Sequence, residues 1–291
     1  MTKIIDGANQ AKRIRADVKK RLLALKAEAK LSVILVGEDQ ASRVYVGMKQ
    51  KACDEAGVIS QVIKINAKQA IQAYKSGNCL IKQTIRKLNN DPKTTGILVQ
   101  LPLPEPIEPG PVLDLIDPIK DVDCLTSRNL GRFFSSGSDQ DLTPCTPKGC
   151  LRLIQSLKLD LKGLQAVVIG RSNIVGKPMA QLLLNQDCTV TICHSQTRNL
   201  KNHTQKAELL VSAIGKPGFI KADMIKADSI LIDVGISRMG KKLQGDFDFD
   251  SAAQKAGAIT PVPGGVGPMT IAMLLENLLI CYQLAHAQKK T

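Results

Sequence analysis

The sequence predicts an α/β protein made of two domains, each built around a mainly parallel sheet. A length of 291 residues is enough for two domains. Short β-branched apolar runs alternate with helical patterns from end to end, which is typical of βα units. The alternation restarts near Thr146, beyond a polar stretch at 135–143. We therefore expect one domain over 1–143 and a second over 144–269.

The first half opens with a basic helix whose apolar positions share one face, at Ile14, Val18, Leu22 and Leu25. Apolar runs then predict strands at 31–36, 61–65 and 96–100, and helices at about 41–56 and 68–88. Proline and polar residues predict irregular structure at 102–111 and 135–143.

The second half repeats the same alternation. A helix is expected near 148–157, with strands at 166–169, 189–193, 208–213 and 229–234. A further strand at 258–260 leads to a turn rich in glycine and proline and to a final apolar helix. This succession is typical of a mononucleotide-binding domain, whose ligand lies beyond the carboxyl ends of the strands.

The first strand of this half ends in a glycine turn, Gly170-Arg-Ser-Asn-Ile-Val-Gly176, followed by Pro178 in a helix-opening position. Glycine lets a backbone approach a pyrophosphate, and the positive end of the helix then faces its charge. Ser172 stands where the usual G-x-G-x-x-G motif has its second glycine. A strand-to-helix corner without a ligand has a similar pattern, so the turn alone is weak evidence.

The strand at 189–193 lacks the acidic residue that holds the ribose 2′-hydroxyl in NAD-binding domains. His194, Ser195 and Thr197 follow it instead, and Arg171 lies in the glycine turn. Because donors and a cation suit a 2′-phosphate, the sequence favours NADP over NAD. On its own, Arg171 would be interpreted as a solvated turn residue.

The composition argues against membrane and metal-binding functions. No apolar stretch approaches the about 18 residues that span a bilayer, and charges from Lys3 onward leave no secretory signal. Eight cysteines without a C-x-x-C pair, together with three histidines, form no zinc-ligand pattern. We therefore expect a cytoplasmic protein with reduced thiols, no metal and no membrane partner.

The net charge of +14 raises the question of nucleic-acid binding. Lysine and arginine are dispersed along the chain, however, and three tyrosines, five phenylalanines and no tryptophan provide few stacking platforms. A dispersed positive field suits small polyanions, such as dinucleotides or polyglutamylated substrates. No nucleic-acid partner is expected.

Ser42, Tyr45 and Lys49 lie at i, i+3 and i+7 of the helix expected at 41–56, so they share one face. A Tyr-x-x-x-Lys pair is also the signature of short-chain dehydrogenases, in which the glycine turn precedes the pair. Here the pair precedes the turn, which argues against that family. Alone, Lys49 would be interpreted as a solvated helix lysine.

Two further positions carry polar groups suited to a site. Gln100 ends a buried strand, where α/β proteins place their ligands. Lys120-Asp-Val-Asp123 offers two carboxylates, of which Asp123 follows an apolar residue and can point inward. An acidic turn fits the same pattern.

Seven motifs occur together and in order. They are Tyr45-Val-x-x-Lys49, Gly96-Ile-Leu-Val-Gln100-Leu-Pro-Leu-Pro104, Lys120-Asp-Val-Asp123, Pro144-Cys-Thr-Pro-Lys-Gly149, Gly170-Arg-Ser-Asn-Ile-Val-Gly176-Lys-Pro178, Cys193-His-Ser195 and Pro261-Val-Pro-Gly-Gly-Val-Gly-Pro-Met-Thr270. With these motifs the chain resembles, over nearly its full length, the bifunctional methylenetetrahydrofolate dehydrogenase/methenyltetrahydrofolate cyclohydrolase family, called FolD in bacteria.

The resemblance implies NADP-dependent oxidation of 5,10-methylenetetrahydrofolate to the 5,10-methenyl form, and hydrolysis of that product to 10-formyltetrahydrofolate. It implies a folate-binding first domain, to which about 270–291 return, an NADP-binding second domain and a cleft between them. It also implies a homodimer that acts on tetrahydrofolate derivatives, polyglutamylated forms included.

The resemblance also assigns roles to individual residues. Lys49 would be the main catalytic residue, with Gln100 modulating its ionisation. Tyr45 would stack on the folate, and Asp123 would hold the pterin ring. The remaining substrate-binding positions would be Ser42, Pro263, Gly264, Gly265 and Thr270. The cofactor-binding positions would be Thr146, Gly170, Arg171, Ser172, Ser195 and Ile236.

The chain departs from the family pattern at Cys124, where a glycine is usual, and at Ser237 and Phe247, which replace a frequent asparagine and valine. Two other classes stay open. A shikimate- or malic-type dehydrogenase shares the domain plan but does not explain the motif at 261–270. A nucleotide-binding regulator without catalysis would be expected to lack the polar set around Lys49.

Overall fold

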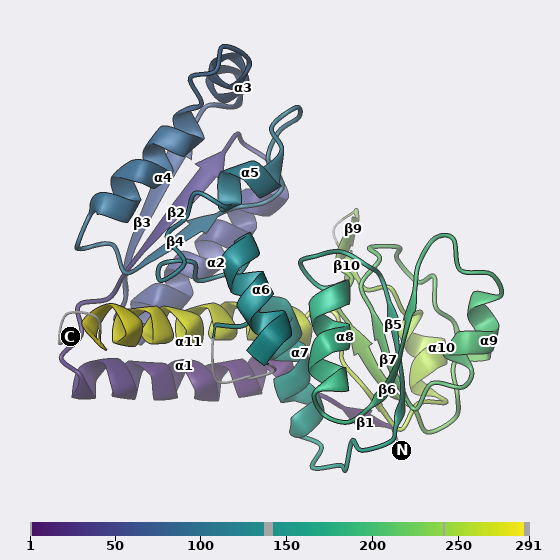
Figure 1. Ribbon diagram of the computed structural model, residues 1–291. Coiled ribbons are helices and arrows are strands. Elements are labelled where there is room, and N and C mark those ends of the chain that lie inside the picture. Colours follow the sequence, from purple (N-terminus) through teal and green to yellow (C-terminus); the bar gives the residue numbers. More distant parts are fainter. Residues whose placement is uncertain (1, 137–141, 241, 288–291) are drawn as a thin grey trace. The chain divides into compact units, whose positions relative to one another are not determined.

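The computed structural model describes residues 2–136, 142–240 and 242–287 (Figure 1). The chain folds into two compact units. The large-sheet unit comprises the chain up to Lys12 together with Pro144–Met273, and the small-sheet unit comprises Arg13–Thr143 together with the chain from Leu274 onward. The helices α1 (Gly7–Ala24) and α11 (Val266–Ala287) contribute to both units.

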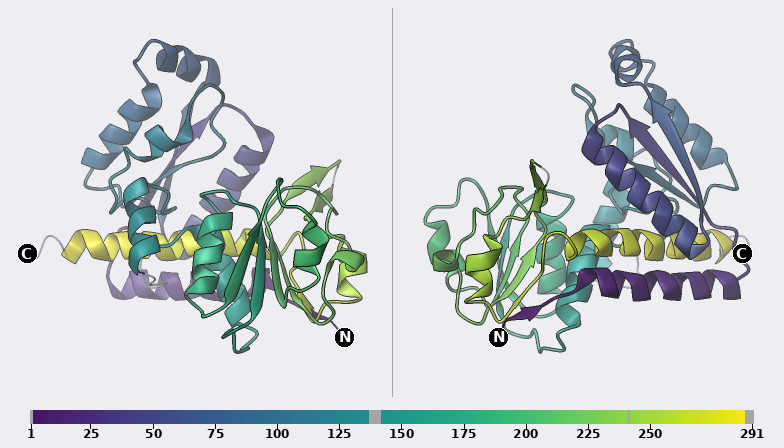
Figure 2. Two further views of the ribbon diagram at one scale, coloured as in Figure 1. Left: turned by 45° about the vertical axis from the view of Figure 1, so that its right-hand side comes forward. Right: turned by 180° about the vertical axis from the view of Figure 1, so that it is seen from behind.

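The small-sheet unit contains three parallel strands in the order β3-β2-β4. They are β3 (Ile59–Ile65), β2 (Lys30–Val36) and β4 (Gly96–Val99). The helices are α2 (Gln40–Ala56), α3 (Ala67–Lys75), α4 (Leu80–Asn90), α5 (Pro109–Leu113) and α6 (Ser127–Ser136). The central strand β2 is buried along nearly its whole length, and apolar side chains of α4 join the same core as those of β2 and β4. Figure 2 shows the unit's parts of α1 and α11 side by side in both views.

The large-sheet unit contains six parallel strands in the order β1-β11-β8-β7-β5-β6. They are β1 (Lys3–Ile4), β11 (Ala258–Ile259), β8 (Ile230–Asp233), β7 (Leu209–Ser212), β5 (Gln165–Ile169) and β6 (Thr189–Cys193). The main helices are α7 (Cys145–Gln155), α8 (Gly176–Leu184), α9 (Leu200–Thr204) and α10 (Phe249–Ala253). Figure 1 shows α7 and α8 on one face of the sheet and α9 and α10 on the other. This is a doubly wound sheet, so the predicted α/β class is confirmed.

The chain reverses its winding direction at β5. Its next strand, β6, pairs on one side of β5, and the following strand, β7, pairs on the other. In doubly wound sheets such a reversal opens a crevice at the carboxyl ends of the strands, where ligands bind. The structure therefore indicates that a ligand would bind this unit at the carboxyl ends of β5 and β7.

Several local expectations were wrong. The single helix expected at 68–88 is divided into α3 and α4, because Gly77 adopts a left-handed φ of 78° between them. The segment 102–111 is irregular as expected up to 108, but α5 begins at Pro109. Leu25 lies beyond α1 and is exposed. The polar stretch at 135–143 falls largely outside the described residues.

Several elements were not predicted. The strand β1, the helix α6 and the hairpin of β9 (Ser237–Met239) and β10 (Lys242–Gln244) are short or lack a clear apolar period. The pairing of β1 with β11 places the start of the chain in the large-sheet unit, whereas the sequence assigned all of 1–143 to the other domain. A two-residue strand carries too little pattern to reveal its partner.

The expectation about apolar stretches also needs correction. Among the described residues, α11 is long and apolar enough to cross a membrane by length and composition. More than half of its most apolar window, 56%, is buried inside the protein, and Asn277 lies fully buried in its middle. These features are those of a core helix. All eight cysteines are buried and none forms a disulfide.

Candidate functional site

The helix α2 presents the predicted polar residues on its inner face. Asp39 caps the helix by accepting the N–H of Ser42 at 2.7 Å, and Gly57 ends it in a left-handed conformation. Ser42 and Lys49 are buried and Tyr45 is partly buried, as the i, i+3, i+7 spacing requires. Burial raises the pKa of the Tyr45 hydroxyl above its usual value.

Lys49 meets Gln100 at the carboxyl end of the small sheet. The Lys49 Nζ donates to Gln100 Oε1 at 3.0 Å, and the Gln100 Nε2 donates to the Leu101 carbonyl at 2.7 Å. The second bond fixes which end of the amide faces the lysine. The Gln100 N–H donates to Ile34 in the central strand, so the amide is held on rigid backbone.

The two carboxylates of the 120–123 segment have different surroundings. Asp121 is buried and accepts the N–H groups of Leu125 and Thr126 and the side-chain amide of Asn129, at 3.2, 2.9 and 2.9 Å. Burial raises the pKa of Asp121 despite these bonds. Asp123 is partly exposed, and its carboxylate forms no hydrogen bond or ion pair within the described part of the chain. Asp121 therefore shapes the turn, and Asp123 is available to a ligand.

The helix α11 supports this turn, a contribution that the sequence did not reveal. The Asn277 side chain donates to the carbonyls of Val122 and Thr143 at 2.9 and 2.8 Å. A Cβ atom at Gly96 would lie 2.2 Å from Val122 and 2.6 Å from Leu278, so β4, the turn and α11 pack in direct contact. A polar asparagine within a mainly apolar helix was the available signal.

Cys124 adopts a left-handed φ of 56°, which explains why the resembled family uses glycine at this position. Its thiol is fully buried and donates to the Leu142 carbonyl at 3.1 Å. The chain therefore keeps the turn with a strained residue, and Asp123 next to it remains available.

In the large-sheet unit, the glycine turn has the close packing that a dinucleotide site requires. A Cβ atom at Gly170 would lie 2.7 Å from the Ala213 carbonyl oxygen, and one at Gly176 would lie 2.2 Å from the Gly170 oxygen. Ser172 Oγ accepts the N–H groups of Val175 and Gly176, at 3.1 and 3.4 Å, where the turn enters α8. The missing second glycine of the motif is thus replaced by a serine whose hydroxyl bonds the backbone of the turn.

Arg171 and Ser195 lie at neighbouring strand ends, because Gly170 donates its N–H to Cys193 at 2.8 Å. Both side chains are exposed, and no carboxylate among residues 2–136, 142–240 and 242–287 pairs with Arg171. The turn after β6 is fixed by the bond from the His194 N–H to Thr197 Oγ1 at 2.8 Å. A cation and a hydroxyl at one edge, without an acid, fit a 2′-phosphate.

The remaining predicted residues also lie in this unit. Thr146 of α7 and Thr270 of α11 share a hydrogen bond of 3.1 Å between their hydroxyls. A Cβ atom at Gly267 would lie 3.5 Å from the Ile236 side chain, so Ile236 lies beside the first turn of α11. Pro263, Gly264 and Gly265 form the loop that enters α11, where the Gly264 carbonyl accepts the Ala8 N–H at 2.8 Å.

The predicted residues therefore form two groups. Ser42, Tyr45, Lys49, Gln100 and Asp123 belong to the small-sheet unit, and the other predicted residues belong to the large-sheet unit. No group of histidine, cysteine, aspartate and glutamate side chains that could hold a metal ion occurs in the portion of the chain that the structure describes.

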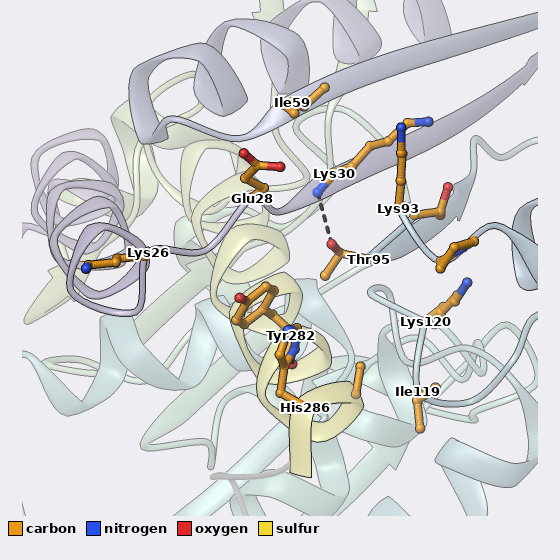
Figure 3. A pocket seen from close by; sticks show the side chains of 13 residues that line it. Lys26, Glu28, Lys30, Ile59, Lys93, Thr95, Ile119, Lys120, Tyr282 and His286 are labelled. Atoms are coloured by element: carbon orange, nitrogen blue, oxygen red, sulfur yellow. Dashed lines mark hydrogen bonds between the residues drawn. The ribbon is translucent and has the colours of Figure 1, made fainter. Parts of the chain in front are cut away.

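The small-sheet unit also contains a cavity of about 990 Å³ at the amino ends of its strands, the edge opposite Gln100 (Figure 3). Although several lysines line it, Lys26 points away from Lys93 in Figure 3. Lys120 donates to three backbone carbonyls, and Lys30 pairs with Asp91 at 3.4 Å. The cavity therefore presents no convergent set of free cations and contains none of the predicted residues.

Both units of the chain match domains of one known protein family. The catalytic domain of tetrahydrofolate dehydrogenase/cyclohydrolase matches residues 5–123, and the NAD(P)-binding domain of the same family matches residues 144–286. The chain belongs to the tetrahydrofolate dehydrogenase/cyclohydrolase family. The predicted family is thereby confirmed, and membership does not favour the shikimate-type or non-catalytic alternatives.

Relatives of this family cover nearly the entire chain. The bifunctional protein FolD of Moorella thermoacetica is 51% identical over 278 residues, which are 94% of this chain and 96% of its own. The crystal structure of the bifunctional FolD enzyme of Campylobacter jejuni has a TM-score of 0.90 and 41% identity, over 98% of this chain and 99% of its own. The Trypanosoma brucei FolD enzyme, solved with NADP and an inhibitor, has a TM-score of 0.91 and 33% identity over 98% of both chains.

Proposed function

We propose that this chain oxidises 5,10-methylenetetrahydrofolate with NADP and hydrolyses the 5,10-methenyl product to 10-formyltetrahydrofolate, with Lys49 as the main catalytic residue. The single observation that carries this proposal is the hydrogen bond between Lys49 and Gln100, on the face that also carries Tyr45. Membership of a dehydrogenase/cyclohydrolase family over both units supports the two activities.

The environment of Lys49 suits proton transfer. Lysine has three donors, and only one is used by the Gln100 oxygen. A neutral amide accepts an N–H from either the charged or the uncharged amine, so it fixes the nitrogen in place without binding the proton as a carboxylate would. Lys49 can then transfer protons during water attack on the methenyl carbon. Oxidation needs no protein acid, so Lys49 and Tyr45 contribute to that step mainly by orienting the folate.

Asp123 is proposed to bind the pterin ring. A reduced pterin presents a 2-amino group beside a ring N–H, and a carboxylate accepts this pair through two parallel hydrogen bonds. The free carboxylate of Asp123, beside the fully bonded Asp121, supports this role. Ser42, Pro263, Gly264, Gly265 and Thr270 are proposed to line the folate.

The large-sheet unit is proposed to hold NADP. The positions are Thr146, Gly170, Arg171, Ser172, Ser195 and Ile236, and the space left by Gly170 and Gly176 supports them. When bound, NADP supplies the acceptor for hydride. Arg171 and Ser195 are suited to bind the 2′-phosphate, so we expect NADP to be preferred to NAD. By resemblance to the family we also propose a homodimer, polyglutamylated substrates and a cytoplasmic location.

One assay tests this function. The purified chain is mixed with 5,10-methylenetetrahydrofolate and either NADP or NAD, while reduced nucleotide and methenyltetrahydrofolate are followed together. The proposal requires reduced nucleotide to form and the methenyl product to pass on to 10-formyltetrahydrofolate. Absence of nucleotide reduction, or equal catalytic efficiency with NAD and NADP, would contradict it. Light scattering of the same sample tests the homodimer.

A further inference from the structure

Two buried aspartates, Asp233 and Asp246, connect the loops that follow β7 and β8. Asp233 is the last residue of β8 and is 4% exposed, and Asp246 follows β10 and is fully buried. The N–H of Asp246 donates to Asp233 Oδ1 at 2.9 Å, and the N–H of Phe247 donates to Oδ2 at 3.0 Å. The carboxylate of Asp233 therefore fixes the segment that carries Asp246.

Asp246 in turn holds the loop after β7. Its Oδ2 accepts the Ser212 hydroxyl and the Ile214 N–H, both at 2.9 Å. Its Oδ1 accepts the Lys216 N–H at 2.7 Å. Both oxygens thus act as acceptors, which the two oxygens of a carboxylate can do and the oxygen and nitrogen of an amide cannot.

Two glycines allow these carboxylates to lie against the backbone. A Cβ atom at Gly235 would lie 2.1 Å from Asp246 Oδ1, and a Cβ atom at Gly245 would lie 2.0 Å from Asp233 Oδ2. The segments Asp233-Val-Gly235 and Gly245-Asp246 therefore interlock, with each glycine packed on the other segment's carboxylate. In the sequence, each of the two aspartates lies close to a glycine. That the two segments pack on one another is decided only by the fold.

The loop held by Asp246 lies at the point where the sheet reverses its winding. It begins at Ala213, whose carbonyl packs against Gly170 of the glycine turn. On the other side, Ile236 directly follows Gly235 of the interlock. Dinucleotides bind doubly wound sheets at this edge. The two aspartate side chains are buried and bonded to the protein, so they cannot contact a ligand there.

We propose that the interlocked pair of Asp233 and Asp246 positions the loop at 213–216 and Ile236 for binding of the dinucleotide. Both aspartates are positioning residues for the NADP site. This inference rests on the proposed function of the large-sheet unit. It explains why two carboxylates are buried side by side where each needs several backbone donors to be accommodated.

The Asp246→Asn variant tests this positioning role directly. The new side-chain NH₂ group would face a backbone N–H or the Ser212 hydroxyl, so one hydrogen bond to the loop would be replaced by two opposed donors. We expect the Kd for NADP, measured by calorimetry, to rise at least tenfold and the Ile214 and Lys216 amides to exchange hydrogen faster. The KM for NADP should rise with little change in kcat at saturation. Cyclohydrolase activity uses no nucleotide, so the ratio of dehydrogenase to cyclohydrolase activity at low NADP should fall at least tenfold.

The matched control is Asp121→Asn, which alters an equally buried carboxylate with three donors in the small-sheet unit. Its Kd for NADP should stay within twofold of that of the wild type. Ser212→Ala is a milder second variant, which removes one donor to Asp246 and should raise the Kd two- to fivefold. If the Asp246→Asn variant does not fold, the Kd for NADP of the Ser212→Ala variant decides whether the positioning role holds.

Two results separate this inference from the proposed function. If the wild-type chain does not bind NADP, the proposed function fails. If the wild type binds NADP and a folded Asp246→Asn variant binds it with a Kd within twofold of the wild-type value, the positioning role is overturned. A Kd for Ser212→Ala equal to that of the wild type would overturn it as well.

Discussion

The Lys49 Nζ donates a 3.0 Å hydrogen bond to the Gln100 side-chain oxygen, and the Gln100 amide is oriented by its own bond to Leu101. The two residues lie 51 positions apart in the chain. Lys49 belongs to α2, and Gln100 directly follows β4. A buried lysine held by a neutral acceptor is the central feature of the proposed cyclohydrolase site.

Lys49→Met should abolish hydrolysis of 5,10-methenyltetrahydrofolate while the protein stays folded. Methionine fills similar space but cannot carry a proton, and loss of a general acid–base group costs about 10²–10⁴-fold in rate. Steady-state hydrolysis and circular dichroism are the measurements. Lys51→Met, at an exposed lysine of the same helix, is the control and should retain activity. Full hydrolysis by the folded Lys49→Met variant would show that another residue transfers the proton.

Arg171→Ala should raise the KM for NADP by about 10–100-fold, because a hydrogen bond to a charged group contributes about 1.5–3 kcal/mol. The KM for NAD should change little, since NAD has no 2′-phosphate. Dehydrogenase kinetics with both nucleotides provide the measurement, and Arg132→Ala, at an exposed arginine of α6, is the control. An equal rise for NAD and NADP would place Arg171 away from the 2′-phosphate.

Asp123→Asn should weaken folate binding by about 10–100-fold, because one acceptor becomes a donor facing the pterin donors, at about 1–3 kcal/mol. Both activities should fall, since they use the same pterin, while the Kd for NADP stays near normal. Calorimetric titrations with a folate ligand and with NADP make the comparison. Unchanged folate affinity would mean that the turn at Cys124 holds Asp123 outside the folate site.

Cys124→Gly should give a more stable protein than Cys124→Ala, by about 1 kcal/mol, because alanine keeps the left-handed strain that glycine relieves. Both variants lose the buried thiol, so their difference isolates the backbone. The same two substitutions at Cys53, inside α2, should show the reverse order, since glycine is about 1 kcal/mol less favourable than alanine in a helix. Chemical denaturation measures both pairs, and the same order at the two sites would contradict the prediction.

The stability of the large-sheet unit should fall as the pH rises toward neutrality and should level off above it. Burial, together with the nearby charge of Asp246, raises the pKa of Asp233 to about 7, above its usual 3.8. Between these values the native state holds a proton that the unfolded chain has lost, so raising the pH destabilises the native state, by on the order of 1 kcal/mol per pH unit. The Tm of the wild type should therefore decline from pH 5 to 7, and Asp233→Asn should show a flatter profile. Parallel profiles would assign the ionisation to another group.

Hydrophobic periodicity in the sequence determined the fold class, most strands and the inner face of α2. These features depend on local alternation of apolar residues, which the chain displays directly. The glycine turn and the missing acid after β6 likewise predicted a preference for NADP from residues close together in sequence. The seven ordered motifs then identified the family, which the matches over both units confirmed.

Tertiary structure alone decided which polar groups meet. The bond between Lys49 and Gln100, the support of the 120–123 turn by Asn277 and the interlock of Asp233 with Asp246 join residues far apart in the chain. The short strand β1 likewise reveals its unit only by pairing with β11. Periodicity reports which face of an element is buried, but not which element covers it. Long-range partners are therefore set by the packing of whole elements, and the sequence shows only that such polar groups need partners.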